Sequence, residues 1–156
     1  MIFVCAMTMA QTNAYPLLPM PQNYKVTDKS FAMGKVKLST PVLKSEWEAF
    51  IVNAGGELAD KAAAEIKIEL LPVIDGVKLN PDEAYRLSVS GKLIKIEAVT
   101  ERGVYWALQT LRQLEKKKGK KSLFAGCEIV DWPAFRIRGF MQDVGRSYIS
   151  VEELKR

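Results

Sequence analysis

The stretch DWPAFRIRGFMQDVGRSYISVEELKR, residues 131–156, marks the place where one structural unit ends and a second begins. Pro133 has no N–H to donate to a sheet and forces Trp132 out of the helical region, which predicts a boundary between units. The pattern after this boundary predicts a strand over residues 136–144, followed by a loop. A helix is predicted to begin at Ser150, because a glutamate three residues later completes a capping box. The order strand, loop, helix is the repeating unit of a (β/α)8 barrel.

Two charged residues of this stretch, Asp143 and Arg146, fall at the C-terminal end of the predicted strand and in the loop after it. Barrels of this kind place their substrate-handling residues at that position. An arginine suits sugar hydroxyls, since its planar guanidinium offers several donors at fixed angles and stays charged at any working pH. The alternative is an ion pair between Arg146 and Asp143 that only braces the loop. Spacing alone leaves both interpretations open.

The sequence resembles the family-20 glycoside hydrolases, the β-N-acetylhexosaminidases, in two motifs. One is DWPAFRIRGFMQDVGR at residues 131–146, and the other is GVYWALQTLRQL at residues 103–114. A looser likeness reaches back to LPMP at residues 18–21, which is similar to the Pro-rich opening of the family's N-terminal α/β domain. The resemblance implies that residues 15–131 form this α/β domain. It also implies that residues 133–156 form the start of the catalytic barrel, which stays incomplete.

The reaction is implied by the resemblance alone. Family-20 enzymes remove terminal non-reducing N-acetylglucosamine or N-acetylgalactosamine from glycans and glycoconjugates with retention, using the substrate's own acetamido oxygen as nucleophile. A glutamate acts as general acid and an adjacent aspartate orients the acetamide. This Asp-Glu pair lies on a later barrel strand and is absent here, so we assign no catalytic residue. Arg146 matches the arginine that contacts the sugar in the −1 subsite. Asp143 matches the acidic residue three positions before it, to which we assign support of the loop.

Three hypotheses of function remain open. The first is the N-terminal part of an exported β-N-acetylhexosaminidase, cut short and inactive alone because its acid and its acetamide-orienting residue are missing. The second is a free-standing carbohydrate-binding or docking module, although Val151 and Leu154 of the last helix would then have no barrel to cover. The third is a related glycosidase, because similar α/β domains precede other sugar-hydrolase barrels. An Asp-Glu motif downstream would decide between them.

The composition limits the size and the class of the protein. At 156 residues the chain has room for one domain of ordinary size, whereas a complete barrel alone needs about 250 residues. An apolar content of 48% with mixed charges indicates a soluble globular class. Much of the net charge of +5 comes from a lysine cluster, which we expect at the end of a helix, solvated and complementing the helix dipole. The cluster consists of Lys116, Lys117, Lys118, Lys120 and Lys121. It has no interleaved aromatic residues to stack bases, so we expect no nucleic acid as a partner. The resemblance implies glycans or glycoconjugates that contain N-acetylhexosamine as partners.

Residues 1–10 are apolar and end in a small residue, which predicts the remnant of a signal peptide and export to the periplasm, cell surface or medium. The usual positive n-region is missing, and the alternative is a buried N-terminal strand. The segment is too short to span a bilayer. Cys5 and Cys127 are the two cysteines and histidine is absent. We therefore predict no disulfide, no metal site and no cofactor.

Hydrophobic periodicity before the boundary predicts an α+β fold, a mostly antiparallel sheet with two covering helices. Alternation of apolar and polar residues predicts strands over residues 23–27, 34–39, 64–71, 85–89, 94–98 and 127–130. The first helix is expected to begin at Ser45 with a capping box to Glu48, and to end at residues 55–56, two glycines. Trp47 lies on its apolar side and is expected in the core.

The second helix is expected to start at Thr100 as its cap and to run to about Lys118. Its apolar stripe is wide enough that we expect this helix to contribute most of the packing against the sheet. The stripe consists of Val104, Ala107, Leu108, Leu111 and Leu114. Gly103 lies in the first turn, where a glycine costs about 1 kcal/mol against alanine. A close approach of backbone would explain it.

Overall fold

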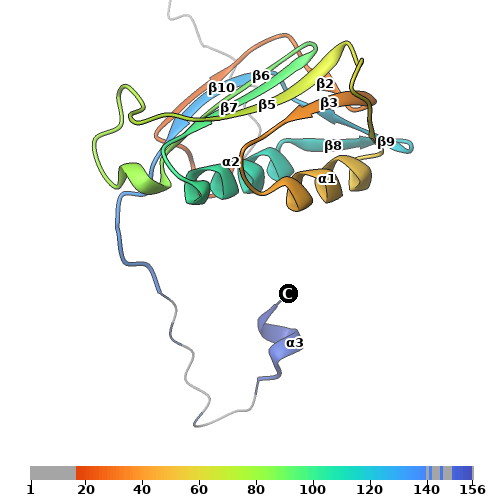
Figure 1. Cartoon of the computed structure of the whole chain (residues 1–156). Helices are drawn as coiled ribbons and strands as arrows, with labels where there is room; N and C mark the ends of the chain where they lie inside the picture. The colour runs from red at the N-terminus through yellow and green to blue at the C-terminus, as the bar shows by residue number, and fades with distance from the viewer. Residues whose placement is uncertain (1–16, 140, 142–144, 146–148, 156) are drawn as a thin grey trace, which may run out of the picture.

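The computed structural model describes residues 17–139, 141, 145 and 149–155, and shows two sheets with two helices on one face of the larger sheet (Figure 1). The larger sheet has seven strands in the order β1-β10-β6-β7-β5-β3-β4, and the smaller has three in the order β2-β9-β8. The strands are β1 Asn23–Val26, β2 Phe31–Ala32, β3 Lys35–Ser39, β4 Glu57–Leu58, β5 Ala64–Leu70, β6 Tyr85–Ser90, β7 Leu93–Ala98, β8 Glu115–Lys118, β9 Lys121–Phe124 and β10 Cys127–Asp131. The helices are α1 Lys44–Asn53, the short 3₁₀ helix η1 Pro81–Glu83, α2 Glu101–Gln113 and α3 Val151–Leu154.

The larger sheet is antiparallel in one half and parallel in the other. Strands β1, β10, β6 and β7 pair antiparallel, whereas β7, β5, β3 and β4 pair parallel. Five of the eight described pairings are antiparallel, in agreement with the predicted class. Alternation in the sequence does not reveal the parallel half. The β3–β5 pairing is parallel because α1 carries the chain across between these two strands, and a helical crossover returns a chain in the same direction.

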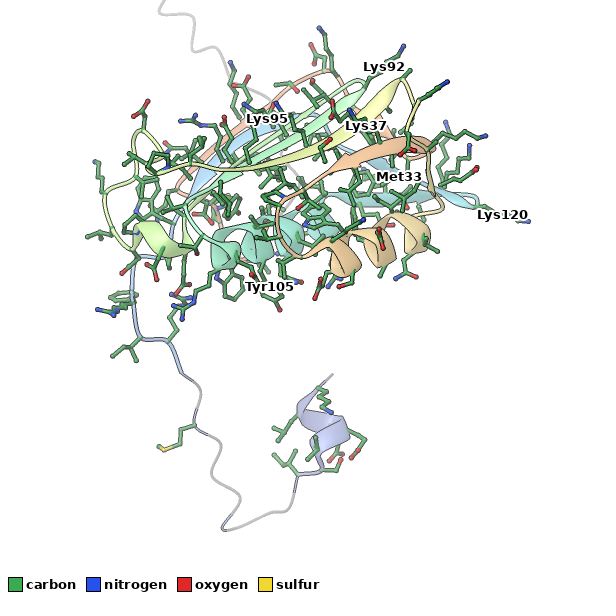
Figure 2. All side chains as sticks on the ribbon, in the orientation of Figure 1. Met33, Lys37, Lys92, Lys95, Tyr105 and Lys120 are labelled. Carbon is green, nitrogen blue, oxygen red and sulfur yellow. The ribbon has the colours of Figure 1, made fainter. Side chains whose placement is uncertain are left out.

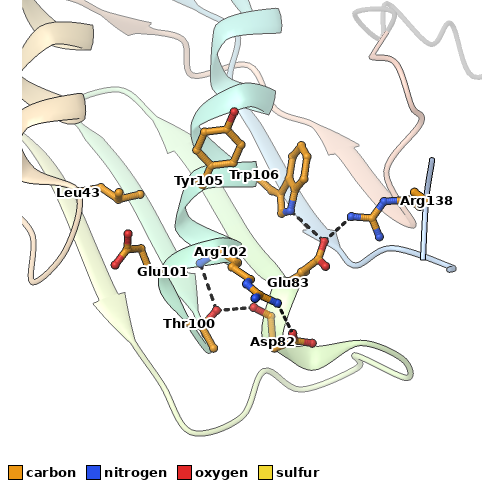
Figure 3. A pocket seen from close by; sticks show the side chains of 9 residues that line it. All are labelled: Leu43, Asp82, Glu83, Thr100, Glu101, Arg102, Tyr105, Trp106 and Arg138. Carbon is orange, nitrogen blue, oxygen red and sulfur yellow. Dashed lines mark hydrogen bonds and ion pairs between the residues drawn. The ribbon is translucent and has the colours of Figure 1, made fainter. Parts of the chain in front are cut away.

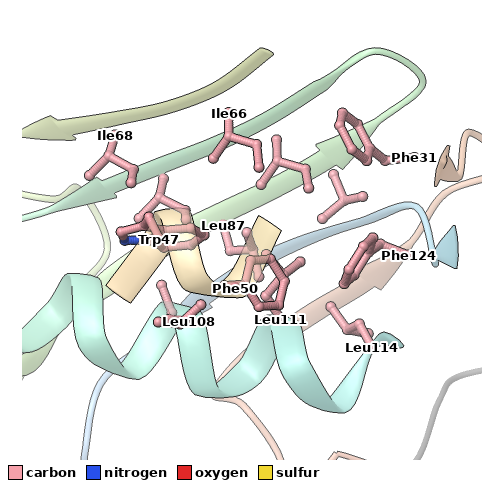
Figure 4. Close-up of a cluster of buried hydrophobic side chains, with 14 of the residues drawn as sticks. Phe31, Trp47, Phe50, Ile66, Ile68, Leu87, Leu108, Leu111, Leu114 and Phe124 are labelled. Carbon is pink, nitrogen blue, oxygen red and sulfur yellow. The ribbon is translucent and has the colours of Figure 1, made fainter. Parts of the chain in front are cut away.

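The core lies between the larger sheet and the two helices (Figure 4). Alternation along β5 turns Ile66 and Ile68 toward the helices, and α1 places Trp47 and Phe50 against them. The rings of Trp47 and Phe50 meet edge to face, with centroids 5.6 Å apart. The stripe predicted for α2 is buried throughout: Val104, Ala107, Leu108, Leu111 and Leu114. The sheet and both helices therefore share one hydrophobic cluster, as the sequence predicts.

The outer side of the larger sheet is charged, and Lys37 and Lys95 point away from the helices there (Figure 2). The two lysines that oppose each other in the register, Lys67 and Lys95, both contact Glu69, at 2.8 and 3.2 Å. Each exposed pair contributes little stability, but charge is balanced across these strands. Four cross-strand neighbours are also ion pairs: Lys25 with Glu128, Lys35 with Glu57, Lys37 with Glu65, and Arg86 with Glu97.

Helix α1 ends as predicted but begins differently. Gly55 adopts φ 76° and donates its N–H to the carbonyl of Val52 at 3.0 Å, while the next glycine donates to Ile51 at 2.8 Å. These are the two hydrogen bonds of a Schellman motif. The capping box predicted at Ser45 is wrong, because Ser45 lies inside the first turn and its hydroxyl donates to Glu46 instead, at 2.8 Å. The helix has no side-chain cap.

Helix α2 is shorter than predicted, and the prediction that it runs to Lys118 is wrong. It ends at Gln113, and the lysine cluster belongs to β8, β9 and the turn between them. Gly119 adopts φ 63° and serves this tight turn, not a helix end. The physical reason is the pattern of Ser122 and Phe124, which alternate with exposed or half-buried residues and are both buried. A lysine run offers no apolar stripe at helical spacing, whereas one side of a hairpin needs only every second residue.

The strand predicted over residues 136–144 is absent from the part of it that the structure describes, residues 136–139 and 141. Ile137 and Met141 are largely exposed. A strand needs a neighbour to satisfy its backbone N–H and C=O groups, and no described strand pairs with these residues. The start of a barrel is therefore not seen in the described part of the chain.

The helix predicted at Ser150 is confirmed as α3. The Ser150 hydroxyl accepts from the N–H of Glu153 at 3.2 Å, and the Glu153 carboxylate accepts from the N–H of Ser150 at 3.1 Å. This is the reciprocal capping box that the sequence predicts. Val151 and Leu154 are exposed, so the apolar side of this helix has no cover among the described residues.

We expect chymotrypsin to cleave after Phe135 well before it cleaves any site within residues 23–131. The Phe135 ring is 73% exposed and its backbone lies outside every helix and strand, whereas proteolysis within folded elements requires local unfolding. A time course followed by mass spectrometry should show the fragment that ends at Phe135 accumulating. Cutting inside residues 23–131 at an equal rate would contradict the prediction.

Cys127 is a buried free thiol on β10. Burial raises its pKa to about 12, so almost no thiolate forms at neutral pH and the residue packs as a small apolar side chain. Cys5 and the rest of the predicted leader, residues 1–10, lie outside the described residues. No described helix is both long and apolar enough to cross a bilayer.

Candidate functional site

Arg146, predicted to contact the sugar, and Asp143, predicted to support its loop, lie outside the described residues, and Gly145 between them is exposed. The structure does describe the segment that leads to them. Residues 133–139, called here the exit segment, follow β10 and contact η1 and α2. The candidate site is therefore the surface that holds the exit segment.

Two aromatic residues, Tyr105 and Trp106, stand on the side of α2 that faces away from the sheet. Val104 and Ala107 are buried, and at 3.6 residues per turn their neighbours fall on the opposite side of the helix. Tyr105 is 46% and Trp106 is 39% exposed. The two rings meet edge to face, with centroids 5.2 Å apart. An exposed aromatic pair of this kind is typical of a contact surface.

Glu83 is the polar centre of this surface (Figure 3). Its carboxylate accepts a hydrogen bond from Nε1 of Trp106 at 3.0 Å and forms an ion pair with Arg138. The Arg138 guanidinium lies 5.8 Å from the centroid of the Trp106 ring and donates to the carbonyl of Phe135 at 2.6 Å. Because 14% of the Glu83 side chain is exposed, solvent screens this pair less than an ordinary surface pair. Glu83 and Trp106 together fix the exit segment to α2.

Thr100 ties η1 to the start of α2. Its hydroxyl accepts from the N–H of Arg102 at 3.2 Å, which confirms the predicted cap, and donates to the carbonyl of Asp82 at 2.5 Å. The Asp82 carboxylate and the Arg102 guanidinium are 3.4 Å apart. These residues line an open cleft of about 730 Å³ that reaches Leu43 before α1. The cleft thus lies between η1, α2 and the residue before α1, and the contacts of Thr100 and Asp82 hold η1 and α2 together.

A second cavity, of about 480 Å³, lies between α2, the exit segment and residues 17–22, called here the N-terminal strap. The Gln113 side chain holds the strap by two hydrogen bonds of 2.9 Å to the backbone of Leu18. The N–H of Gln22 donates to the Asp131 carboxylate at 3.0 Å. The strap and the exit segment therefore lie against the same end of β10.

The Tyr85 hydroxyl lines this second cavity. It shares a hydrogen bond of 2.6 Å with the hydroxyl of Thr110 and donates to Asp131 at 3.3 Å. Burial, together with the negative charge of Asp131, raises the pKa of Tyr85 above its usual range. A phenol that stays neutral and has its hydrogen bonds made is a structural group and not an acid or base at neutral pH.

The described contacts of this surface hold the exit segment in place. Asp82 and Glu83 are each paired with an arginine. Among the described residues no three His, Cys, Asp or Glu side chains gather to hold a metal ion. The arrangement can position the exit segment and whatever follows it.

Sequence reasoning missed Glu83, Trp106 and Arg138 as a cluster. One signal was available, since Tyr105 and Trp106 fall off the apolar stripe of α2 although both are aromatic. The partner could not be found in this way, because Glu83 and Arg138 are 55 positions apart and no local pattern links them.

The fold and this surface define an α/β domain that anchors the segment after it. The family model described as glycosyl hydrolase family 20, domain 2, matches residues 14–132. The chain belongs to glycosyl hydrolase family 20.

Known relatives and structures agree with this family. The β-hexosaminidase of Porphyromonas gingivalis is 28% identical over an alignment 156 residues long, which spans 90% of this chain and 20% of that protein. The β-hexosaminidase of Vibrio furnissii is 35% identical over 97 residues, 62% of this chain and 15% of that protein. The GH20 exo-β-N-acetylglucosaminidase of Vibrio harveyi, solved with N-acetylglucosamine, superposes with a TM-score of 0.67 at 31% identity, covering 90% of this chain and 22% of that one. The chain thus spans about a fifth or less of the length of the two curated relatives.

Proposed function

We propose that this chain is the N-terminal part of an exported β-N-acetylhexosaminidase. The enzyme would remove terminal non-reducing N-acetyl-D-hexosamine, GlcNAc or GalNAc, from glycans by substrate-assisted retaining catalysis. The observation that carries the proposal is the family match over residues 14–132. In this proposal residues 1–10 are the remnant of a leader, residues 15–131 are the α/β domain, and residues 133–156 begin the catalytic barrel.

The described anchor gives the α/β domain a role in this enzyme. Arg138 is held by Glu83 and Trp106, and Arg146 follows eight positions later in the sequence. Pinning the exit segment fixes where the first barrel strand starts, so that Arg146 reaches the sugar and Asp143 supports its loop. The exposed rings of Tyr105 and Trp106 would be covered by the barrel. Positioning of this kind matters, because a small misplacement of a binding group costs rate.

The catalytic Asp-Glu pair of the family lies on a later barrel strand, whereas the adjacent Asp-Glu of this sequence, residues 82–83, lies in η1, before the predicted start of the barrel. The chain by itself should therefore not hydrolyse glycosides, and activity should require residues that follow Arg156. The first experiment is to read the coding sequence beyond Arg156 and to assay the extended product on a chromogenic N-acetyl-β-glucosaminide, beside the 156-residue chain.

In the extended protein we expect Arg146→Ala to lower kcat/KM by about 10- to 100-fold. The change would remove a charged donor and leave a buried sugar hydroxyl unpaired, which costs about 1.5–3 kcal/mol. The matched control is Arg112→Ala on α2, whose guanidinium contacts Gln109 at 3.3 Å on an exposed surface and should leave the rate unchanged. A stop codon after Arg156, with saturable sugar binding and no hydrolysis, would instead make the chain a carbohydrate-binding module.

A further inference from the structure

The hairpin of β8 and β9 carries most of the excess positive charge of the chain. Residues 115–121 hold five lysines and one glutamate, in a protein whose formal net charge is +5. Every lysine of this segment is exposed. We call residues 115–121 the basic hairpin.

The charges of the basic hairpin are arranged unlike those of the other strands. In the larger sheet, cationic side chains lie opposite glutamates or share one. In the basic hairpin, Lys118 lies directly opposite Lys121, and neither has an acidic partner among the described residues. Like charges directly opposite each other destabilise a sheet. Lys67 and Lys95 of the larger sheet also lie opposite each other, but there Glu69 contacts both lysines and compensates their charge. The basic hairpin keeps the local cost without such compensation at Lys118 and Lys121, which indicates a use for the charge.

The two sides of the basic hairpin differ. The inner side carries Glu115 and Lys117, which pair at 2.6 Å, and Lys117 also donates to the carbonyl of Asn53 at 3.0 Å. That lysine braces the hairpin against α1. The outer side carries Lys116, Lys118 and Lys121, with Lys120 in the turn. Residues of one side lie about 7 Å apart along a strand and about 5 Å apart across strands, so the ammonium groups form a dense row.

The basic hairpin projects from the end of the domain opposite the exit segment. Lys120 marks its tip in Figure 2, and Figure 1 shows the chain leaving the domain at the other end of α2. The exit segment, with the residues that follow it, therefore starts its course far from the hairpin. Within the described part of the chain nothing covers the lysines.

We infer that the basic hairpin binds an anionic polysaccharide, one that carries sulfate or carboxylate groups along its chain. The hairpin presents only lysines at its tip, and a lysine is a compact point charge without the fork that recognises one carboxylate or phosphate in a fixed geometry. A row of point charges suits a polymer with repeated anions, and it gains affinity by releasing the polymer's counterions. The inference rests on the proposed function in one respect, the choice of a glycan as the polyanion.

Two other polyanions fit the hairpin less well. Binding of single-stranded nucleic acid adds aromatic side chains that stack on bases, and residues 115–121 contain none. Binding at a bilayer interface adds apolar or aromatic side chains that enter it, and the segment also lacks these. Both are outcomes that the experiment can reveal.

The test uses the 156-residue chain and fluorescent heparin oligosaccharides of defined length. The variant carries Lys118→Gln, Lys120→Gln and Lys121→Gln. The control carries Lys44→Gln, Lys61→Gln and Lys78→Gln, which removes the same charge from other exposed sites. A third protein carries arginine at positions 118, 120 and 121. Binding is measured by fluorescence anisotropy across a salt series.

We expect the hairpin variant to lose at least about tenfold in affinity and its salt slope to fall by about two to three, since each phosphate-like contact contributes close to one. The control should lose less than about threefold and the arginine protein should bind as the original does. Thermal unfolding should be unchanged or improved for the hairpin variant, because the Lys118 and Lys121 repulsion is removed. Equal losses in variant and control would overturn the inference, as would tighter binding to anionic vesicles or to single-stranded oligonucleotides. Hydrolysis plays no part in this readout, so the result does not depend on whether the extended protein is a hexosaminidase.

Discussion

Replacing Trp47 with alanine is expected to lower the free energy of unfolding by about 3–5 kcal/mol, a large share of the stability of a small domain. Trp47 is fully buried between α1 and the sheet and packs against Phe50. Its removal takes away the largest side chain of the core and leaves a cavity whose walls, among them Ile66 and Ile68, belong to a paired strand and cannot collapse fully. Urea unfolding followed by circular dichroism measures the effect.

Trp47→Phe separates volume from polarity at the same site. The indole Nε1 is buried and has no hydrogen-bond partner among the described residues, which costs about 1–3 kcal/mol. Phenylalanine loses some contact area but also removes this N–H. The net destabilisation should therefore stay below about 2 kcal/mol. Trp106→Ala, on the exposed side of α2, is the matched control and should cost about 1 kcal/mol or less. If Trp47→Ala proved as mild as Trp106→Ala, the described core would be wrong.

Gly103→Ala is expected to destabilise the domain by about 3 kcal/mol or more, although alanine is the better helix former. A Cβ at position 103 would lie 2.2 Å from the carbonyl oxygen of Ala84 and 3.0 Å from the Cβ of Ala98. Ala84 is buried and leads directly into β6, so its backbone cannot move aside without disturbing the sheet. The close approach predicted for Gly103 from the sequence is confirmed by this geometry.

The matched change is Gly34→Ala, where a Cβ meets nothing within 4 Å. It should shift stability by less than about 0.5 kcal/mol. Thermal and urea unfolding of both variants decide the matter. A Gly103→Ala protein that equals or exceeds the original in stability would show that α2 lies farther from Ala84 than described.

Sequence patterns predicted the strands and helix ends correctly where the preference of a short segment agrees with its place in the tertiary fold. The alternation over β5, β6 and β7 and the cap at Thr100 each depend on residues within one element, and the structure confirms them. The same patterns gave wrong predictions where packing between segments distant in the sequence determines the secondary structure. Lys118 lies in a strand because Phe124, on the opposite side of the turn, must be buried.

In the candidate site, too, the sequence predicts the local features and misses the contacts between distant residues. The sequence identifies a boundary at Pro133 and a charged pair, Asp143 and Arg146, beyond it. The anchor of the exit segment joins Glu83 to Arg138, a contact that a single sequence cannot disclose. Asp143 and Arg146 lie outside the described residues, so their roles stay a prediction.

The two ends of the domain are neighbours. Strand β1 pairs with β10, and Gln22 of the N-terminal strap contacts Asp131 and Trp132 just where the exit segment begins. The chain thus enters and leaves the core at the same place. A domain with neighbouring ends can be inserted into a longer polypeptide, or removed from it, without changing the path of the surrounding chain. A domain with neighbouring termini is suited to transfer between genes by recombination as one unit.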